Sequence, residues 1–211
     1  MTLRLNGSTS GYTEIDAPAV AGSNTLVLPT GNGSSGQYLQ TNGSGALSWA
    51  TVTSPSVALT AATSVASTSG TSIDFTSIPS GVKRITVMFN NVSTNGASSK
   101  LLQIGISTGI ENSGYDSQTA LAGATAGYGT STAGFILYGS GAGESLYGHA
   151  VITLMGSNLW AYSSTCRIAT NYMQVAGGSK TLSGTLDRLR ITTVNGTDTF
   201  DAGSINIMYE G

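Results

Sequence analysis

Few side chains in this sequence could perform acid–base or nucleophilic catalysis. His149 is the only histidine, and the single Gly-x-Ser-x-Gly segment, residues 105–109, lies between an expected strand and an expected loop. A serine hydrolase needs a nucleophile, a base and an orienting acid held together, and its nucleophile turn leads from a strand into a helix, which is not expected here. We therefore expect His149 to be a strand-edge or surface residue, and we expect the protein not to be an enzyme.

Two neighbouring carboxylates come closest to an acid pair. Asp198 and Asp201 could flank a sugar as in a glycosidase, or bind Ca²⁺ together with backbone carbonyls. Both follow the turn-forming Asn195-Gly196, in a region where Asp side chains commonly accept hydrogen bonds from backbone amides. No regular spacing of acidic residues resembles a calcium loop, so we expect turn capping, no metal and no cofactor.

Two further features could indicate a phosphate-binding loop or a reactive cysteine, but their sequence context supports neither. The glycine-rich residues 139–144 lack the Lys-Ser/Thr pair of a phosphate-binding loop, so we expect a flexible loop there. Cys166 is the only cysteine, which excludes an intrachain disulfide and favours a buried, unreactive thiol.

Aromatic side chains are a better lead to function. Amphipathic rings bind protein and glycan surfaces by stacking and by a hydroxyl or indole hydrogen bond. The candidate receptor-binding residues fall in the middle of the chain: Tyr115, Tyr128, Tyr147, Trp160 and Tyr162. The alternative for such rings is a place in the core. The strand pattern favours the core for Trp160, whereas Tyr128 and Tyr147 lie in expected loops.

The composition favours β-structure throughout. Charged residues make up 9% of the 211 residues, against a usual value of about 25%, while serine and threonine together number 59 and glycine 29. Serine, threonine and glycine disfavour helices, whereas threonine, valine, isoleucine and tyrosine suit a pleated surface. The net charge of −2, with 8 lysines and arginines, supplies no basic stripe, so nucleic acid is not an expected partner.

The sequence shows no targeting or membrane-spanning segment. The first residues lack the apolar stretch of a signal peptide, and nowhere do about 18 apolar residues follow one another. We therefore expect synthesis in a cytoplasm and no membrane insertion.

Three regions are expected along the chain. Residues 1–50 hold very short strand candidates between Asn-Gly-Ser turns, with too few large apolar side chains to offset the entropy of folding alone. This segment must borrow a core, most simply from identical chains, which predicts a trimeric β-stalk for trimerisation or attachment. Residues 51–70 form a linker around Pro55, and residues 71–211 form the head.

The head has the pattern of an antiparallel β-sandwich of the jelly-roll kind. Ile85, Val87 and Phe89 share one face of a strand within residues 82–89. Further strands are expected at residues 72–75, 101–107, 134–138, 148–155, 159–169, 181–194 and 204–210. Residues 108–132 break the pattern and are expected to form a long loop, and residues 172–181 a connection.

Several of these segments resemble known phage proteins. Residues 71–89, 178–191 and 195–207 are similar to the C-terminal head of bacteriophage and prophage tail-fibre or tail proteins. Residues 3–12 and 36–49 resemble a segment of tail fibres and other structural proteins of cyanobacterial phages. The matching motifs are strands and turns and cover about half of the chain, whereas residues 108–175 match no pattern of this kind.

The resemblance implies a virion structural protein made in the host cytoplasm and located in the tail. As a trimeric tail fibre it would attach to other tail or baseplate proteins through its N-terminal segment and bind a host-surface glycan such as lipopolysaccharide. One alternative is a capsid-decorating head fibre or tail protein that contacts only virion proteins. A polysaccharide-degrading tailspike fits less well, because tailspikes resemble long parallel β-helices with carboxylate pairs.

Overall fold

The computed structural model describes residues 2–52, 59–123, 126–139, 141–168 and 172–211. The chain divides into two compact units, residues 1–56 and residues 57–211, and this boundary falls inside the expected linker. The described residues form antiparallel sheets and contain no helix, which confirms the all-β class. Accordingly, they include no helix that could cross a membrane.

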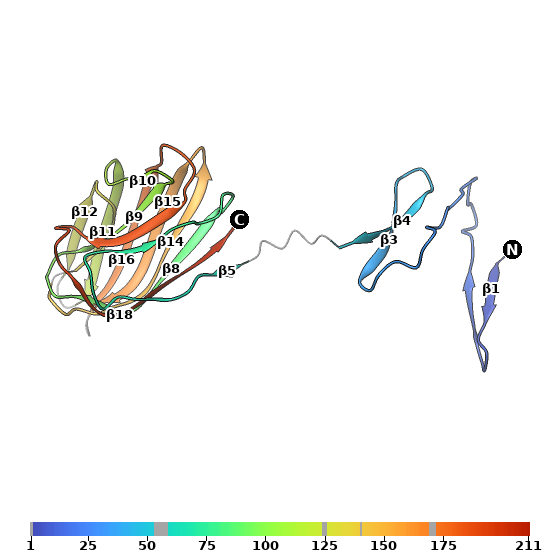
Figure 1. The fold of residues 1–211 in the computed structure, drawn as a ribbon, viewed down its shortest axis with the longest axis horizontal. Coiled ribbons are helices and arrows are strands. Elements are labelled where there is room, and N and C mark those ends of the chain that lie inside the picture. The colour runs from blue at the N-terminus through green and yellow to red at the C-terminus, as the bar shows by residue number, and fades with distance from the viewer. Residues whose placement is uncertain (1, 53–58, 124–125, 140, 169–171) are drawn as a thin grey trace. The chain divides into compact units, whose positions relative to one another are not determined.

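The N-terminal unit contains two separate hairpins (Figure 1). β1 (Leu3–Asn6) pairs with β2 (Tyr12–Ile15), and β3 (Gln37–Thr41) pairs with β4 (Leu47–Thr51). Not one of residues 2–52 is buried. A two-stranded hairpin is marginally stable at best in water, so this unit has no core of its own.

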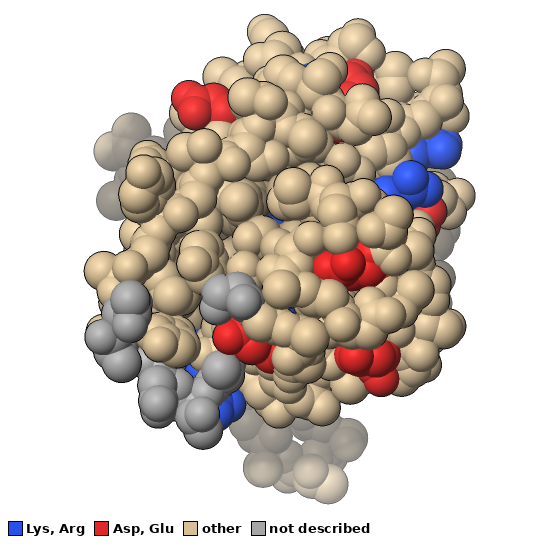
Figure 2. Space-filling view, turned by 90° about the vertical axis from the view of Figure 1, so that its left-hand side faces the viewer, with Lys and Arg blue, Asp and Glu red and all other residues tan. Residues whose placement is uncertain are grey.

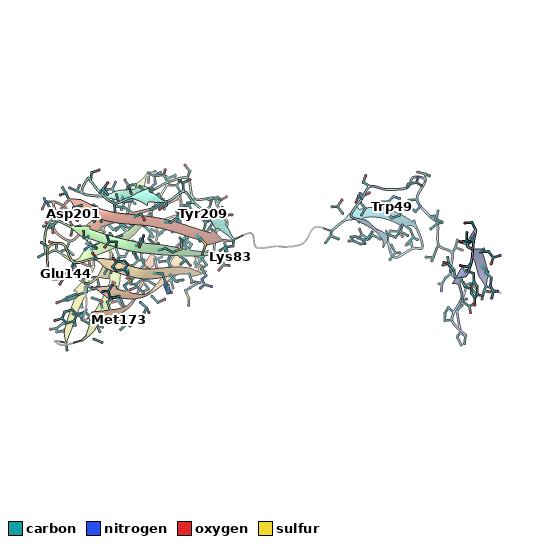
Figure 3. The ribbon with its side chains drawn as sticks, turned by 90° about the horizontal axis from the view of Figure 1, so that it is seen from below. Trp49, Lys83, Glu144, Met173, Asp201 and Tyr209 are labelled. Carbon is teal, nitrogen blue, oxygen red and sulfur yellow. The ribbon has the colours of Figure 1, made fainter. Side chains whose placement is uncertain are left out.

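Trp49 of β4 contacts the segment that precedes the second hairpin (Figure 3). Its indole Nε1 donates a hydrogen bond to the Gly31 carbonyl oxygen at 2.5 Å. The ring lies against Gly33, where a side chain would overlap the indole and where φ is +69°. Glycine is therefore required at position 33 by both space and backbone conformation.

In the described part of the head, nine strands form the larger sheet in the order β12-β11-β16-β15-β14-β8-β18-β5, and β6 also pairs with β18. All of its strand pairs are antiparallel. The strands are β5 (Thr60–Ala61), β6 (Val65–Ala66), β8 (Arg84–Thr94), β11 (Tyr115–Gly123), β12 (Gly127–Ser131), β14 (Leu146–Gly156), β15 (Leu159–Ile168), β16 (Tyr172–Thr181) and β18 (Phe200–Glu210).

The smaller sheet has the order β10-β9-β17-β7, and β13 also pairs with β9. Its strands are β7 (Ile73–Phe75), β9 (Lys100–Ile106), β10 (Gly109–Ile110), β13 (Phe135–Leu137) and β17 (Arg188–Thr193). Gly105 of β9 is the cross-strand partner of Ile110 in β10, and a side chain at position 105 would overlap the backbone of Gly109. The short edge strand β10 therefore depends on a glycine opposite it.

The two sheets share one hydrophobic core. The predicted alternation of β8 is confirmed, because Ile85, Val87 and Phe89 are all buried. Leu189 and Ile191 of β17 are fully buried from the opposite sheet. Each such side chain contributes about 1.5–3 kcal/mol on burial, so the head has its own source of stability.

The closing strand behaves as its sequence indicates. Ile205 and Ile207 of β18 are 1% and 2% exposed, and the strand pairs along its length with β8. Figure 3 shows that β18 runs from Asp201 at one end of the head to Tyr209 at the other. The final strand is therefore part of the core sheet.

Three expectations about the head are wrong. Residues 108–132 are not one long loop, because they contain β10, β11 and β12. Residues 172–181 form β16 instead of a connection. Residues 60–66 of the expected linker form β5 and β6, which pair with β18.

Candidate functional site

Three of the five aromatic candidates are buried, which corrects the expected surface role of Tyr115 and Tyr162 and agrees with the core position favoured for Trp160. Tyr115 is 3% exposed, Trp160 2% and Tyr162 4%. They lie on β11 and β15, and all three belong to the shared core. Alternation within these strands places the three rings on the inner face of the larger sheet.

Tyr115 ties the two sheets together through its hydroxyl group. The oxygen accepts a hydrogen bond from the Ile104 N–H at 2.7 Å and donates one to the Glu111 carbonyl oxygen at 2.8 Å. Its ring meets Phe135 edge to face, with centroids 4.9 Å apart. Burial raises the pKa of the Tyr115 hydroxyl far above its ordinary value, so it stays protonated and remains a donor. The role of Tyr115 is structural.

Tyr162 begins a buried polar network that also joins the sheets. Its hydroxyl lies 3.0 Å from Ser164 Oγ and donates to the Ile136 carbonyl oxygen at 3.1 Å. Gln174, which is fully buried, donates to Ser164 Oγ at 2.9 Å and accepts from the Tyr138 N–H at 2.5 Å. Because every member has a partner, the network fixes β13 against β15 and β16.

The two other candidate rings lie apart on the outer face of the larger sheet. Tyr128 of β12 is 78% exposed. Tyr147 of β14 is half-buried, donates to Asn91 Oδ1 at 2.7 Å, and has the Arg167 guanidinium 5.3 Å from its ring centroid. Three strands, β11, β16 and β15, separate β12 from β14. The structure therefore does not combine the aromatic candidates into one site.

A groove on the outer face of the smaller sheet is a better-formed site. It has a volume of about 280 Å³, and its walls come from β7, β9, β10 and β17. Planar polar side chains dominate this groove. Its lining residues are Asp74, Thr76, Gln103, Gly109, Ile110, Asn112, Arg188, Leu189 and Arg190.

Register explains why the polar groups meet there. Asp74, Arg190 and Gln103 are direct cross-strand partners on β7, β17 and β9. Their sequence neighbours Ile73, Phe75, Leu102, Ile104, Leu189 and Ile191 are buried in the core. Side chains alternate between the two faces of a sheet, so the polar row lies on the face away from the core, where Gln103 is itself buried at 7% exposure.

Ion pairs fix both arginines of the groove. Arg190 forms a two-point contact with Asp74, with Nε–Oδ1 at 2.7 Å and Nη2–Oδ2 at 2.8 Å. This hydrogen bonding raises the pKa of Arg190 above its already high value. Arg188 donates from Nε to Asp187 at 2.6 Å and from Nη2 to the Ser107 carbonyl oxygen at 2.8 Å.

A second hollow of about 390 Å³ borders the same segment of chain. Gly109, Ile110 and Asn112 line both hollows, and the second also includes Glu111 and Ser183. The two hollows therefore adjoin each other at the segment that begins with β10.

Glu111, which lines this second hollow, forms an ion pair with Lys180. Lys180 Nζ lies 2.6 Å from Glu111, and Ser183 donates to the same carboxylate from its backbone N–H and its hydroxyl. Desolvation raises the pKa of Glu111, but the hydrogen bonds from Lys180 and Ser183 outweigh it, so the pKa lies below its ordinary value. Glu111 is therefore ionised at neutral pH.

The two neighbouring carboxylates, Asp198 and Asp201, accept hydrogen bonds that hold nearby turns in place. Asp198 accepts hydrogen bonds from the Ser98 N–H at 3.0 Å and from Asn195 Nδ2 at 2.6 Å. These bonds, led by that from Asn195, lower its pKa. Asp201 accepts from the Ser93 hydroxyl. The turn-capping interpretation is confirmed for Asp198.

Lys100 lies buried near this segment. Burial lowers its pKa, although the nearby carboxylates of Glu144, Asp201 and Asp198 act in the opposite direction. Figure 3 places Glu144 and Asp201 at the same end of the head. The buried ammonium group thus lies among carboxylates that compensate its charge.

The other chemically suggestive residues stand alone. His149 is exposed on β14, and its cross-strand partners are Thr165 and Met88. Burial raises the pKa of the Cys166 thiol to about 12, despite its contact with the His149 carbonyl oxygen. Within the described ranges, no three His, Cys, Asp or Glu side chains are placed to hold a metal ion.

Sequence reasoning did not find the groove. The available signal was the alternation of Arg188 and Arg190 with Leu189 and Ile191, which indicates one charged and one buried face. It does not show that Asp74 or Asn112 lies beside them. Figure 2 shows how few charged residues occupy one face of the molecule, so a local gathering of charge is informative. No protein-family model, curated protein or solved structure matches this chain.

Proposed function

We propose that this chain is a virion structural protein, a trimeric phage tail fibre made in the host cytoplasm. Its N-terminal unit would form a trimeric stalk and attach to other tail or baseplate proteins. Its head, a β-sandwich of the jelly-roll kind, would bind a host-surface glycan such as lipopolysaccharide. The observation that carries this proposal is the absence of any buried residue among residues 2–52.

The first hairpin has two chemically different faces. Leu3 and Leu5 of β1 share one face with Ile15 of β2, and all three are more than half exposed. On the other face, Arg4 pairs with Glu14 at 3.3 Å. Such a hairpin gains stability when its apolar face is covered, and identical chains are the simplest source of cover.

The rest of the N-terminal unit also exposes apolar side chains. They include Val20, Leu26, Val27, Leu28, Tyr38 and Leu39. Contiguous exposed apolar surface marks interaction sites in soluble proteins. The head, by contrast, buries its own core, so assembly and binding are assigned to different units.

Multivalency links assembly to binding in this proposal. Several copies of a weak site on one stalk raise the effective concentration of each site on a repetitive surface. Affinity for a cell surface then exceeds that of any single head. This mechanism requires assembly but no catalytic group.

The test is light scattering of the purified full-length chain, with Leu3→Ser/Leu5→Ser as the assembly variant. Wild-type protein is expected at the mass of three chains. Burying the exposed half of both leucines is worth about 1.5–3 kcal/mol per chain, so the double variant should raise the dissociation constant by a factor of about 10–150 per chain.

Met173→Ser/Val175→Ser is the matched control. These residues also alternate along one strand, β16, and are 45% and 53% exposed, but they lie on the head. The control should remain trimeric. A stable wild-type monomer would overturn the proposal. Dissociation of the control but not of the Leu3/Leu5 variant would show that the head, and not the N-terminal unit, mediates assembly.

A further inference from the structure

We propose that the groove lined by Asp74, Asn112 and Arg190 binds a neutral oligosaccharide. The inference rests on the proposed glycan-binding role of the head and assigns it a site and a ligand class. It replaces the aromatic candidates, three of which are buried.

The lining of the groove favours a hydrophilic ligand. Small-molecule pockets are mostly apolar with a few polar groups, whereas five of the nine residues that line this groove have charged or amide side chains. Asp74, Gln103, Asn112, Arg188 and Arg190 all border it. They supply carboxylate, amide and guanidinium groups, which together offer both acceptors and donors. A ligand rich in hydroxyl groups can use both kinds, because each hydroxyl donates one hydrogen bond and accepts others.

The charges of the groove favour a neutral ligand over an anion. Arg190 is paired with Asp74, and Arg188 with Asp187, at 2.7 and 2.6 Å. The formal charge of these four groups sums to zero. An anion would meet carboxylates beside every guanidinium, whereas a hydroxyl can bridge the two members of a pair.

The groove is also fixed before any ligand arrives. The two-point contact of Arg190 orients its guanidinium and the Asp74 carboxylate, and Gln103 is held by donating to the Ala133 carbonyl oxygen at 2.8 Å. The segment after β10 is held by Tyr115, whose hydroxyl binds the Glu111 carbonyl oxygen. Preorganised groups lose little entropy on binding, which suits a shallow site for a weak ligand.

The second hollow provides room for a second sugar ring, so the site fits an oligosaccharide and not only a single sugar. Because Gly109, Ile110 and Asn112 border both hollows, a ligand lying across β10 would contact the two in succession. The neighbouring charges, Glu111 and Lys180, again neutralise each other. A linear oligosaccharide with adjacent rings in the two hollows fits this arrangement.

The experiment measures binding of full-length protein to defined sugars by biolayer interferometry. The probes are neutral tetrasaccharides of glucose, galactose, mannose and N-acetylglucosamine, the corresponding monosaccharides, and tetragalacturonate as an acidic probe. The groove variants are Asn112→Ala and Arg188→Lys. Arg167→Lys, on the outer face of the larger sheet, is the matched control.

Wild-type protein is expected to bind at least one neutral tetrasaccharide more tightly than its monosaccharide and more tightly than tetragalacturonate. Each groove variant should weaken that binding about tenfold or more, and Arg167→Lys should leave it unchanged. Asn112 is exposed, so its variant should fold, which thermal unfolding checks. Undiminished binding by both groove variants would overturn the site while leaving a glycan-binding head. Preference for tetragalacturonate, or no binding to any neutral probe, would overturn the proposed ligand class. Light scattering tests trimer assembly separately, so a failure of this proposal is distinguishable from a failure of the proposed function.

Discussion

Replacing Tyr115 by phenylalanine tests whether this residue is a structural link or a surface ligand. The change removes one oxygen atom, which accepts from the Ile104 N–H at 2.7 Å and donates to the Glu111 carbonyl oxygen at 2.8 Å. The edge-to-face contact with Phe135 remains possible, since the ring is kept. The variant therefore isolates the hydroxyl group.

The expected loss of stability follows from the two partners. Ile104 is fully buried, so its N–H would lose its partner without access to water, at a cost of about 1–3 kcal/mol. The Glu111 residue is only partly buried, and its carbonyl group loses less. Together they predict a destabilisation of about 2–3 kcal/mol for Tyr115→Phe.

Urea unfolding at fixed protein concentration measures this loss, with Tyr128→Phe as control. With a slope of about 2–3 kcal/mol per molar urea, the midpoint of Tyr115→Phe should fall by about 1 M. Tyr128 is 78% exposed, so the same chemical change there should alter stability by less than about 0.5 kcal/mol. Equal midpoints for the two variants would refute the structural role of the Tyr115 hydroxyl.

Three further predictions concern buried and paired groups in the head. Gln174→Leu should destabilise by about 2–4 kcal/mol in urea, because it leaves the Tyr138 N–H without its partner, whereas exposed Gln118→Leu should be nearly neutral; equal effects would contradict the buried network. Cys166, with its pKa raised to about 12 by burial, should not react with Ellman's reagent near pH 8 until the head unfolds, and rapid labelling of native protein would contradict its burial. The pKa of Glu111 is lowered in the folded state, so its stabilising contribution is present above its ordinary value of 4.5 and is lost as the pH falls through the folded value. Wild-type protein should therefore lose more stability than Glu111→Gln between about pH 6 and pH 3, and parallel curves would contradict that sign.

The sequence predicts the strands whose inner faces are aliphatic. β8, with Ile85, Val87 and Phe89, and β18, with Ile205 and Ile207, carry a period-two pattern that requires one buried face. Their burial follows from side-chain type alone, because large aliphatic groups gain most by leaving water. Local pattern and tertiary structure agree for these elements.

β11 shows why the sequence pattern predicts a loop in the middle of the head where the structure has strands. Its buried face includes Tyr115, Ser117 and Thr119, and the exposed positions between them hold Asp116 and Gln118. A serine or threonine on the inner face gives no hydrophobic signal. Ser117 is buried because its hydroxyl accepts a hydrogen bond from the Ile136 N–H of β13, a partner that only the folded chain supplies. Tertiary contacts therefore determine this strand.

The groove depends even more on distant parts of the chain. Asp74 and Arg190 are 116 positions apart, and only the pairing of β7 with β17 brings them together. A sequence pattern within one strand cannot indicate such a meeting.

The composition nevertheless gives the groove added weight. The chain has only 8 basic and 10 acidic residues, and two ion pairs meet at the groove while a third, Lys180–Glu111, borders the adjoining hollow. Exposed ion pairs stabilise a fold little, by about 0–1 kcal/mol each, so stability alone is a weak reason for placing charges there. Rigid, mutually neutralised donors and acceptors are what recognition of hydroxyl groups requires. The low overall charge thus strengthens the case that these pairs serve binding.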